Sequence, residues 1–476
     1  MTTDRRWRAY AVLAVSYFMT IVDLTITNVA LPTIGRDLHF AESNLQWVVT
    51  AYGLTFGGLL LLGGRAADLL GRRRIFMLGL VLFTAGSLAC ALANTDLLLI
   101  VMRGVQGLGA AIVLPSALSI VMNMFEEGAD RNRALGVWGA IAASGATVGL
   151  ITGGLLLRYL NWRYIFFLNV PIGTGALLLA PRIVPESRAG GRRRYDAFGA
   201  VSITAGLLLL VYALSMAPQD GWATAKTISL LATSGALVLL FLLIEARVEA
   251  PLMPLRLFRL STLAGANAVG LLLGGSFFAF IFIGTLYMQQ VLGWDALQTG
   301  LAWLATSVTS VALAGLSQAL VTRVSARLVM ALGMGLIGGG ILWATRVPVQ
   351  GHFWGDLAGP LFVTGAGTAF AFIPISVAAL AGVGERDAGI ASGLLNASQQ
   401  IGGAIGVAVA SSVAASRLES LVRAGASTPA ALTGGFQRAL WVCGAVGLTA
   451  VPVSFLLIRR TEVAPATAAH GTEVAA

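Results

Sequence analysis

Charged side chains are scarce in this chain of 476 residues, because Asp, Glu, Lys and Arg make up 11% of it, against about 25% in soluble domains. Hydrophobic residues make up 57%. A chain with so few charges cannot shield its surface from water. The composition therefore excludes an ordinary soluble protein and indicates that the lipid bilayer is its solvent.

Cysteine and histidine are also rare. Cys90 and Cys443 both lie in apolar runs, which excludes a disulfide framework and favours the role of small hydrophobic residues. His39, His352 and His470 lie in loops or in the tail, apart from one another. We therefore expect no metal site and no cofactor.

The sequence also has few of the groups that catalysis or pumping needs. A membrane-embedded enzyme requires several His, Cys or carboxylate groups at depth, and Asp23 is the only carboxylate in the middle of an apolar run, since Glu245 lies at a run's end. We find no phosphate-binding G-x-x-x-x-G-K-[ST] loop, which argues against a primary pump without an ATP-binding partner. We find no pore-lining repeat that would favour a channel. The chain is therefore not predicted to be an enzyme.

What the chain has in abundance is long apolar runs. A membrane span needs about 20 mostly apolar residues. The N-terminal MTTDRRWRAY leads into such a run without an A-x-A cleavage site, so we interpret that run as a retained first helix and not a signal peptide. We predict fourteen spans, near residues 9–32, 45–63, 75–93, 97–120, 134–157, 164–181, 198–216, 228–246, 263–288, 297–320, 328–345, 357–381, 389–415 and 434–458.

The net charge of +10 arises from short basic clusters between these runs. The clusters do not form one basic face, which argues against a nucleic-acid partner. With fourteen spans and a cytoplasmic N-terminus, 22 of the 31 basic residues fall inside, 8 fall outside, and Arg103 lies within a span. This asymmetry follows the positive-inside rule and predicts that both termini are cytoplasmic.

The chain contains an internal repeat. Residues 104–120 (GVQGLGAAIVLPSALSI) and 363–380 (VTGAGTAFAFIPISVAAL) share a Gly-x-Gly pattern, small residues and a proline, with Gly107 and Gly365 in matching places. Parallel repeats build the halves of some transporters, with the substrate site between them. We therefore expect the arrangement that follows: an N-terminal six-helix bundle at 1–181, a linker region with two extra helices at 182–262, a C-terminal six-helix bundle at 263–458, and a disordered cytoplasmic tail at 459–476.

The segment between the second and third predicted spans is GGRAADLLGRRR. It resembles the cytoplasmic signature of the major facilitator superfamily, G-x-L-a-D-r-x-G-r-k. The matching residues are Gly64, Asp68, Gly71, Arg72 and Arg73. Ala66 and Leu69 depart from the pattern. The glycines allow a tight turn, and Asp68 is expected to pair with an Arg or cap a helix, which would make the loop a conformational switch.

Two in-span ionisable residues lie in further motifs. LIVMRGVQGLGAA resembles the superfamily's helix-4 motif and contains Arg103, while VDLTITNVALP resembles the helix-1 motif of the fourteen-helix drug:proton antiporters and contains Asp23. An in-span charge is costly and usually faces a partner or a cavity, although Arg103 is also near enough to the interface to snorkel. The family fold implies that these two helices are adjacent.

Two more blocks complete the resemblance. In GVWGAIAASGATVGLITGGLLL, Gly149, Gly153 and Gly154 match the antiporter motif G-P-x-x-G-G, but Leu150 replaces its proline. NWRYIFFLNVPIG, residues 161–173, matches a W-R-W-I-F-x-x-N-x-P-x-G block of the fourteen-helix antiporters, with Tyr164 in place of the second Trp. The resemblance covers essentially the whole chain and implies a major-facilitator-type fold.

The resemblance implies a secondary transporter of the plasma (inner) membrane that exports small amphipathic compounds, such as drugs or antibiotics, in exchange for protons by alternating access. We expect Asp23 to bind the proton and Arg103 to tune it, because burial favours the neutral carboxyl and a nearby guanidinium favours the ionised form. The proton gradient would be the energy source. The expected partners are lipid, protons and amphipathic small molecules, and the protein is expected to be monomeric.

The substrate cavity is harder to locate. Polar or aromatic residues within the predicted spans are candidates, and each is equally suited to hydrogen bonding between helices. They are Asn28, Gln106, Tyr287, Gln290, Asn396, Gln399 and Gln400. Two other functions stay open: a dedicated exporter of one natural metabolite (a self-made antibiotic, siderophore or amino acid), and proton symport for uptake, which the helix count and the glycine motif argue against.

Overall fold

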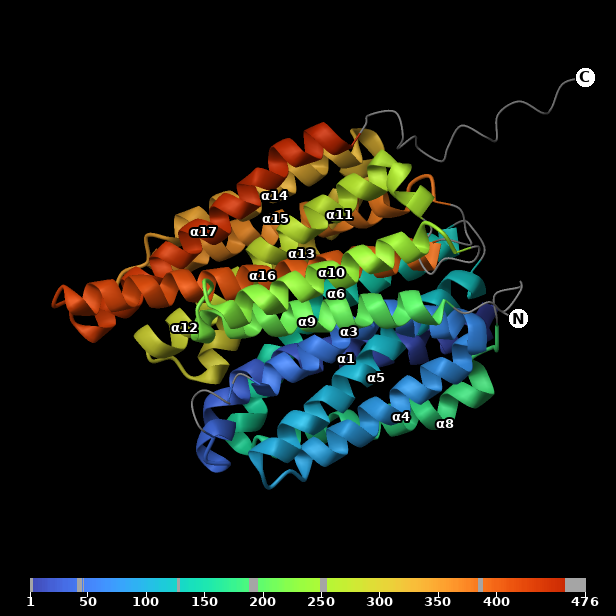
Figure 1. The fold of residues 1–476 in the computed structure, drawn as a ribbon, viewed down its shortest axis with the longest axis horizontal. Coiled ribbons are helices and arrows are strands. Elements are labelled where there is room, and N and C mark those ends of the chain that lie inside the picture. The colour runs from blue at the N-terminus through green and yellow to red at the C-terminus, as the bar shows by residue number, and fades with distance from the viewer. Residues whose placement is uncertain are drawn as a thin grey trace, which may run out of the picture.

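The computed structural model describes residues 3–40, 45, 47–125, 129–187, 196–248, 255–383 and 388–458, and every regular element in these residues is a helix (Figure 1). The expected tail at 459–476 lies outside them. So does the side chain of Asp68. Each of the fourteen predicted apolar runs lies on a helix or on consecutive helices, so the all-helical prediction is confirmed.

The first part of the chain forms helices that pack mainly with one another. They are α1 (Thr3–Asp37), α3 (Trp47–Leu70), α4 (Arg72–Ala91), α5 (Asp96–Met124), α6 (Ala129–Tyr159), α7 (Arg163–Phe167) and α8 (Asn169–Ile183).

Two helices follow, α9 (Ala197–Asp220) and α10 (Ala225–Glu245). The remaining elements are η1 (Leu255–Arg259), α11 (Ser261–Leu273), η2 (Gly274–Phe278), α12 (Ala279–Leu286), η3 (Tyr287–Val291), α13 (Ala296–Arg323), α14 (Ala326–Ala344), η4 (Phe353–Leu357), α15 (Ala358–Leu380), α16 (Ala388–Arg423) and α17 (Thr428–Leu457).

Eleven helical segments of the described chain are long and apolar enough to cross a bilayer. Three further helices, α3, α6 and α9, contribute shorter apolar segments at Trp47–Leu60, Val148–Tyr159 and Phe198–Leu214. The structure therefore has the helical content of a multi-pass membrane protein.

Glycines let several helices approach at backbone distance. On α6, Gly145, Gly149 and Gly153 recur every fourth residue and face α1, so one stripe of the helix is flat. A methyl group built on Gly145 would lie 2.7 Å from Ile21, and one on Gly153 would lie 2.9 Å from Ile26. Larger residues on this stripe would force α1 and α6 apart.

The helices after α10 pack in the same pairs as those before α9. The pairs α1–α6, α3–α5 and α4–α5 have counterparts in α11–α16, α13–α15 and α14–α15. Gly107 on α5 packs against Tyr52 of α3, and Gly365 on α15 packs against Thr306 of α13. The repeated glycine pattern thus lies at equivalent helix contacts in the first set of helices (α1–α8) and in the second set (α11–α17).

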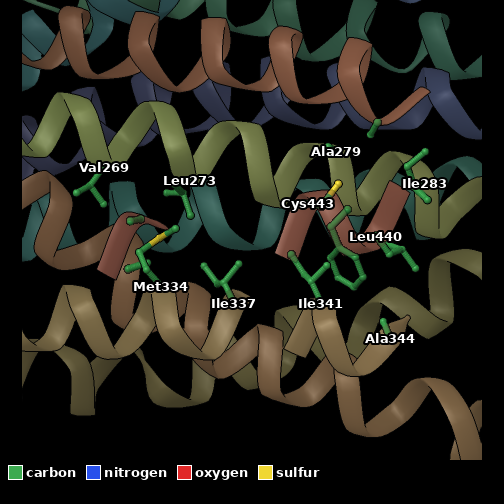
Figure 2. Close-up of a cluster of buried hydrophobic side chains, with 14 of the residues drawn as sticks. Val269, Leu273, Ala279, Ile283, Met334, Ile337, Ile341, Ala344, Leu440 and Cys443 are labelled. Carbon is green, nitrogen blue, oxygen red and sulfur yellow. The ribbon is translucent and has the colours of Figure 1, made fainter. Parts of the chain in front are cut away.

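One face of α14 packs into the hydrophobic core of the second set. Met334, Ile337, Ile341 and Ala344 lie three or four residues apart on α14 and form one buried face. Figure 2 shows this face pointing toward side chains of α11, α12 and α17, including Cys443. These side chains are apolar, so this face of α14 contributes packing between helices.

The helices α9 and α10 pack on each other and lie between the two sets in Figure 1. Helix α9 contacts α3 on one side and α16 on the other. Buried Ile203, Leu207 and Phe241 form a cluster with Leu394 and Ile401 of α16. The pair therefore covers the place where α3 and α16 meet.

Candidate functional site: a buried carboxylate–guanidinium network

The sequence places one carboxylate in the middle of α1 and one guanidinium in α5, and the structure brings them together. Nη1 of Arg103 donates to Oδ2 of Asp23 over 2.6 Å, and neither side chain is exposed at all. Isolated charges are very costly in an apolar interior, and removing either partner of a buried pair strands the other. The carboxylate of Asp23 and the guanidinium of Arg103 can therefore be buried only together.

Arg103 is held by more than its ion pair. Its Nε donates to the carbonyl oxygen of Val48 on α3 at 3.0 Å, and Nη1 also donates to Oε1 of Gln106 at 2.8 Å. The guanidinium lies over the ring of Tyr52, 4.4 Å from its centroid, and 5.6 Å from that of Phe166. Two aromatic faces and a carbonyl stabilise the cation independently of Asp23. Nη2 has no hydrogen-bond partner within the described structure.

Gln106 connects the pair to α4. Its Nε2 donates to Oδ1 of Asp23 at 2.7 Å and to Oγ of Ser87 at 2.8 Å, while the Cys90 thiol lies 3.9 Å from its Oε1. Because Arg103 can only donate, Oε1 must face the guanidinium and the amide N–H groups must face the carboxylate. The sequence marked Gln106 as a cavity candidate, and the structure places it inside this network, fully buried.

Asn169 is the network member that the sequence reasoning did not select. Its Nδ2 donates to Oδ1 of Asp23 at 2.7 Å, and the side chain is buried. Asn169 begins α8 directly after the break at Leu168, and Pro171 has no N–H to donate to the Phe167 carbonyl four residues earlier. Its place in the N-x-P part of the motif was the available signal.

The same motif anchors α7 at the end of α1. The indole Nε1 of Trp162 donates to Oδ2 of Asp37 at 2.7 Å, and Arg163 donates to the carbonyl of Ala93 at 2.6 Å. Phe166 lies one turn further, over Arg103. The block therefore supplies three contacts in chain order. Trp162 bonds to the end of α1, Phe166 packs over the guanidinium of Arg103, and Asn169 donates to the carboxylate of Asp23.

The loop between α3 and α4 is a second site predicted from the sequence. Gly71 has φ 114°, a backbone conformation that residues with a side chain rarely adopt, and α4 begins directly after it. The backbone N–H of Arg73 donates to Oε1 of Glu186 at 3.1 Å, and Arg73 and Arg74 each approach Oε2 at 3.8 Å. Glu186 thus caps the N-terminus of α4, where a carboxylate is favoured. Glu186 carries no motif signature of its own in the sequence and was not predicted.

The other residues of the motif lie on the two flanking helices, Gly64 on α3 and Arg72 and Arg73 on α4, so that only Gly71 stands between them. The backbone N–H of Arg72 donates to the carbonyl of Ser187 at 3.0 Å, and Gly64 packs against Pro115 of α5. The loop is therefore bound to the end of α8 and to the proline turn of α5.

The glycines of the α6 motif face two different helices. Gly149 and Gly153 contact α1, whereas a methyl group on Gly154 would lie 2.6 Å from the Cα of Leu297 on α13. Leu150, where the motif has proline, is buried, and its backbone carbonyl would lie 3.0 Å from a methyl group on Gly300. This part of α6 is therefore one of the contacts between the first and second sets of helices, together with that of α3 and α16.

The remaining cavity candidates are scattered. Asn28 is half-buried and bonds to its own helix, and Gln290 is exposed. The Tyr287 hydroxyl donates to the Pro348 carbonyl at 2.6 Å, inside the second set. Gln399 and the adjacent Gln400 are half-buried on α16, where Gln399 packs against Gly270 of α11.

Asn396 lines a small cavity of about 20 Å³ between the two sets. Tyr17 and Trp138 line the same cavity, and their rings stack with centroids 4.2 Å apart. The space suits a water molecule and is far below the 300 Å³ or more of a ligand pocket. The sets are thus packed closely here. No group of His, Cys, Asp or Glu in the described part of the chain could hold a metal.

Comparisons with known proteins agree with this architecture. The model of the Major Facilitator Superfamily matches residues 13–407. The cephamycin export protein CmcT of Amycolatopsis lactamdurans is 39% identical, over 86% of this chain and 85% of its own length. The puromycin resistance protein pur8 of Streptomyces alboniger is 35% identical (97% and 93%), and the multidrug resistance protein Stp of Mycobacterium tuberculosis is 37% identical (85% and 75%).

Solved structures of similar fold include an auto-inhibited POT family peptide transporter, with a TM-score of 0.68 over 97% of this chain and 98% of that one. The human organic anion transporter MFSD10 aligns with a TM-score of 0.59 over 95% of this chain and 100% of that one. Both are 16% identical in sequence, so they bear on the fold alone.

Proposed function

The chain belongs to the Major Facilitator Superfamily, and we propose that it exports antibiotics or other small amphipathic compounds in exchange for protons. The observation that carries the proposal is the fully buried pair of Asp23 and Arg103 between α1 and α5. A carboxylate that is shielded from water and matched to one cation can change its proton occupancy when its surroundings change.

In this mechanism Asp23 binds one proton from the outside and releases it inside. With Arg103 at 2.6 Å the ionised carboxylate is stabilised. When the helices shift and the guanidinium withdraws, burial without a partner favours the neutral acid, which takes up a proton. The return of Arg103 then expels the proton toward the other side. Asp23 is the proton-binding group and Arg103 sets its proton affinity.

Neutralising Asp23 leaves a cation inside the bundle. The carbonyl of Val48 and the rings of Tyr52 and Phe166 remain around Arg103 and offset part of this cost. Arg103 therefore has a supported position in both protonation states, which a reversible carrier requires.

The conformational change would take place where the two sets of helices meet. We assign the outer closure to the α6–α13 contact at Gly154 and Gly300, where backbones touch and any widening breaks the packing. The loop with Gly64, Asp68, Gly71, Arg72 and Arg73 would act at the inner end as a switch, with Glu186 holding its arginines.

The cargo is proposed from the relatives, whose names refer to cephamycin, puromycin and multidrug resistance. Tyr17, Trp138 and Asn396 line the small cavity between the two sets, and this cavity would widen into an amphipathic binding site when the sets separate. Export of one self-made antibiotic is the second candidate, and the relation to the cephamycin exporter favours it. We do not propose uptake by symport.

We propose that all fourteen predicted spans cross the inner membrane, with both termini in the cytoplasm. The supporting observations are the 22-to-8 distribution of basic residues and the match of each predicted span to a helix or to consecutive helices. Within this topology the helices α1–α8 and α11–α17 form the two bundles, and α9 and α10 are the extra pair. The proton gradient supplies the energy, no cofactor is required, and a monomer is sufficient.

Drug accumulation in cells that express the chain tests this function. Expression should lower the steady-state content of an amphipathic antibiotic, and a protonophore should restore the content found in empty-vector cells. Resistance to one compound only, across a panel that includes cephamycins and puromycin, would favour the dedicated exporter. An effect of expression that survives the protonophore would contradict proton coupling.

A further inference from the structure

The two oxygens of the Asp23 carboxylate have different surroundings. Oδ1 accepts from Nε2 of Gln106 and from Nδ2 of Asn169, both at 2.7 Å. Oδ2 accepts from Nη1 of Arg103 at 2.6 Å and from no other group in the described structure. A carboxylate oxygen has room for about two in-plane donors, so Oδ1 is saturated and Oδ2 has one free position.

Gln106 cannot give up its bond by turning its amide. Its Oε1 faces the donor-only guanidinium of Arg103, and its second N–H is bonded to Ser87. A flip would aim N–H groups at the guanidinium and an oxygen at the carboxylate. Oδ1 therefore keeps at least this donor whatever the protonation state.

We infer that Asn169 and Gln106 direct the transported proton to Oδ2, the oxygen on which Arg103 is the single donor in the described structure; this inference rests on the proposed role of Asp23 in proton exchange. An O–H bond forms at the free position of Oδ2 with a proton from outside water, and the Arg103 hydrogen bond to that oxygen weakens because its acceptor is no longer charged. Oδ1 becomes the carbonyl oxygen and retains both amide donors. The same O–H bond breaks when the proton leaves to inside water.

The consequence is that protonation loosens one contact and preserves two. Asn169 still joins α8 to α1 and Gln106 still joins α5 to α1, while Arg103 loses its ionic attraction to Asp23. Asn169 is a positioning residue for the exchange. The other titratable groups around Asp23 are Tyr52 of α3 and Cys90 of α4.

The test uses the full-length protein in proteoliposomes and the variant Asn169→Leu, which has a similar size and no N–H donor. The ionised carboxylate loses one of its charge-assisted bonds, so the pH of half-maximal exchange should rise by about one unit. The matched control is Asn267→Leu, a buried Asn of α11 that bonds to Leu263 and Ser398, away from Asp23. It should leave the pH profile unchanged.

Infrared difference spectra between acid and alkaline pH report on Oδ1 itself. The band of the protonated acid, identified by its absence in Asp23→Asn, should move to higher wavenumber in Asn169→Leu, because its carbonyl oxygen accepts one bond fewer. An unchanged band and pH profile in a folded Asn169→Leu protein would overturn the inference. A band that persists in Asp23→Asn would instead contradict the proposed proton site.

If Asn169→Leu does not fold, Asn169→Asp keeps the size of the residue and serves as the second variant. A second carboxyl facing Oδ1 must share a proton with it, so the pH midpoint should rise by at least as much as expected for the Leu variant. A midpoint equal to that of the unmodified protein would show that residue 169 does not act on Asp23.

Discussion

Arg103 and Asp23 form a 2.6 Å ion pair that joins α5 to α1 with no exposed surface on either side chain. A pair in this position is a poor means of stabilising a fold, because desolvation offsets much of the Coulomb attraction. It is well suited to proton coupling, because protonation of Asp23 changes an interaction that joins two helices.

Removing the Arg103 cation alone should lower the stability of the fold strongly. In Arg103→Leu the Asp23 carboxylate is left buried without its ion-pair partner, and loss of one partner costs about 3–5 kcal/mol. The double variant Asp23→Asn with Arg103→Leu removes both charges and should recover a large part of this loss. Thermal unfolding in detergent measures both. Additive losses in the double variant would show that the two residues do not interact in solution.

The cap on α4 predicts a smaller, salt-dependent effect. Glu186→Gln keeps an oxygen for the Arg73 N–H and removes the charge near Arg73, Arg74 and the helix N-terminus, so stability should fall by about 0.5–1 kcal/mol. High salt should reduce the difference from the unmodified protein. The control is Glu419→Gln, because the Glu419 carboxylate pairs with Arg423 and both side chains are largely exposed. If the control is destabilised as much as Glu186→Gln, the carboxylate of Glu186 does not stabilise the N-terminus of α4 beyond an ordinary surface ion pair.

The contact between α6 and α13 predicts a change in conformational equilibrium. Gly154→Ala places a methyl group 2.6 Å from the Cα of Leu297, and backbone cannot yield as a side chain does, so the outer closure should be weakened. An impermeant maleimide added outside should label Asn28→Cys several-fold faster in this background. Native Cys90 and Cys443 are buried and should react little.

The matched control for that labelling is Gly339→Ala on α14, where an added methyl group meets nothing within 4 Å. It should leave the labelling rate of Asn28→Cys unchanged. Slower labelling in Gly154→Ala than in the control would place the outer closure elsewhere.

The helices could be predicted from the sequence because their causes are local. Every apolar run falls on a helix, since length and hydropathy along one segment suffice to specify it. The proximity of Asp23 and Arg103 was also foreseen, because two in-span charges require a partner and the family motifs lie on adjacent helices. That proximity is visible in the structure as a direct bond.

The rest of the site depends on packing that no single segment contains. Gln106 was interpreted as a cavity residue, yet Arg103, Ser87 and Asp23 from three helices determine how its amide points. Asn169 reaches Asp23 because α8 begins at that residue and packs on α1. Its sequence neighbours reveal the helix break but not the partner.

The most direct test of the account is proton-coupled exchange by Asp23→Asn in proteoliposomes with an imposed pH gradient. Asp37→Asn, the same substitution near the end of the same helix, is the control and should retain exchange, since Asp37 bonds to Trp162 and not to Arg103. We predict that the Asp23→Asn protein folds and binds substrate but transports none in response to the gradient. Full gradient-driven exchange by Asp23→Asn would contradict it.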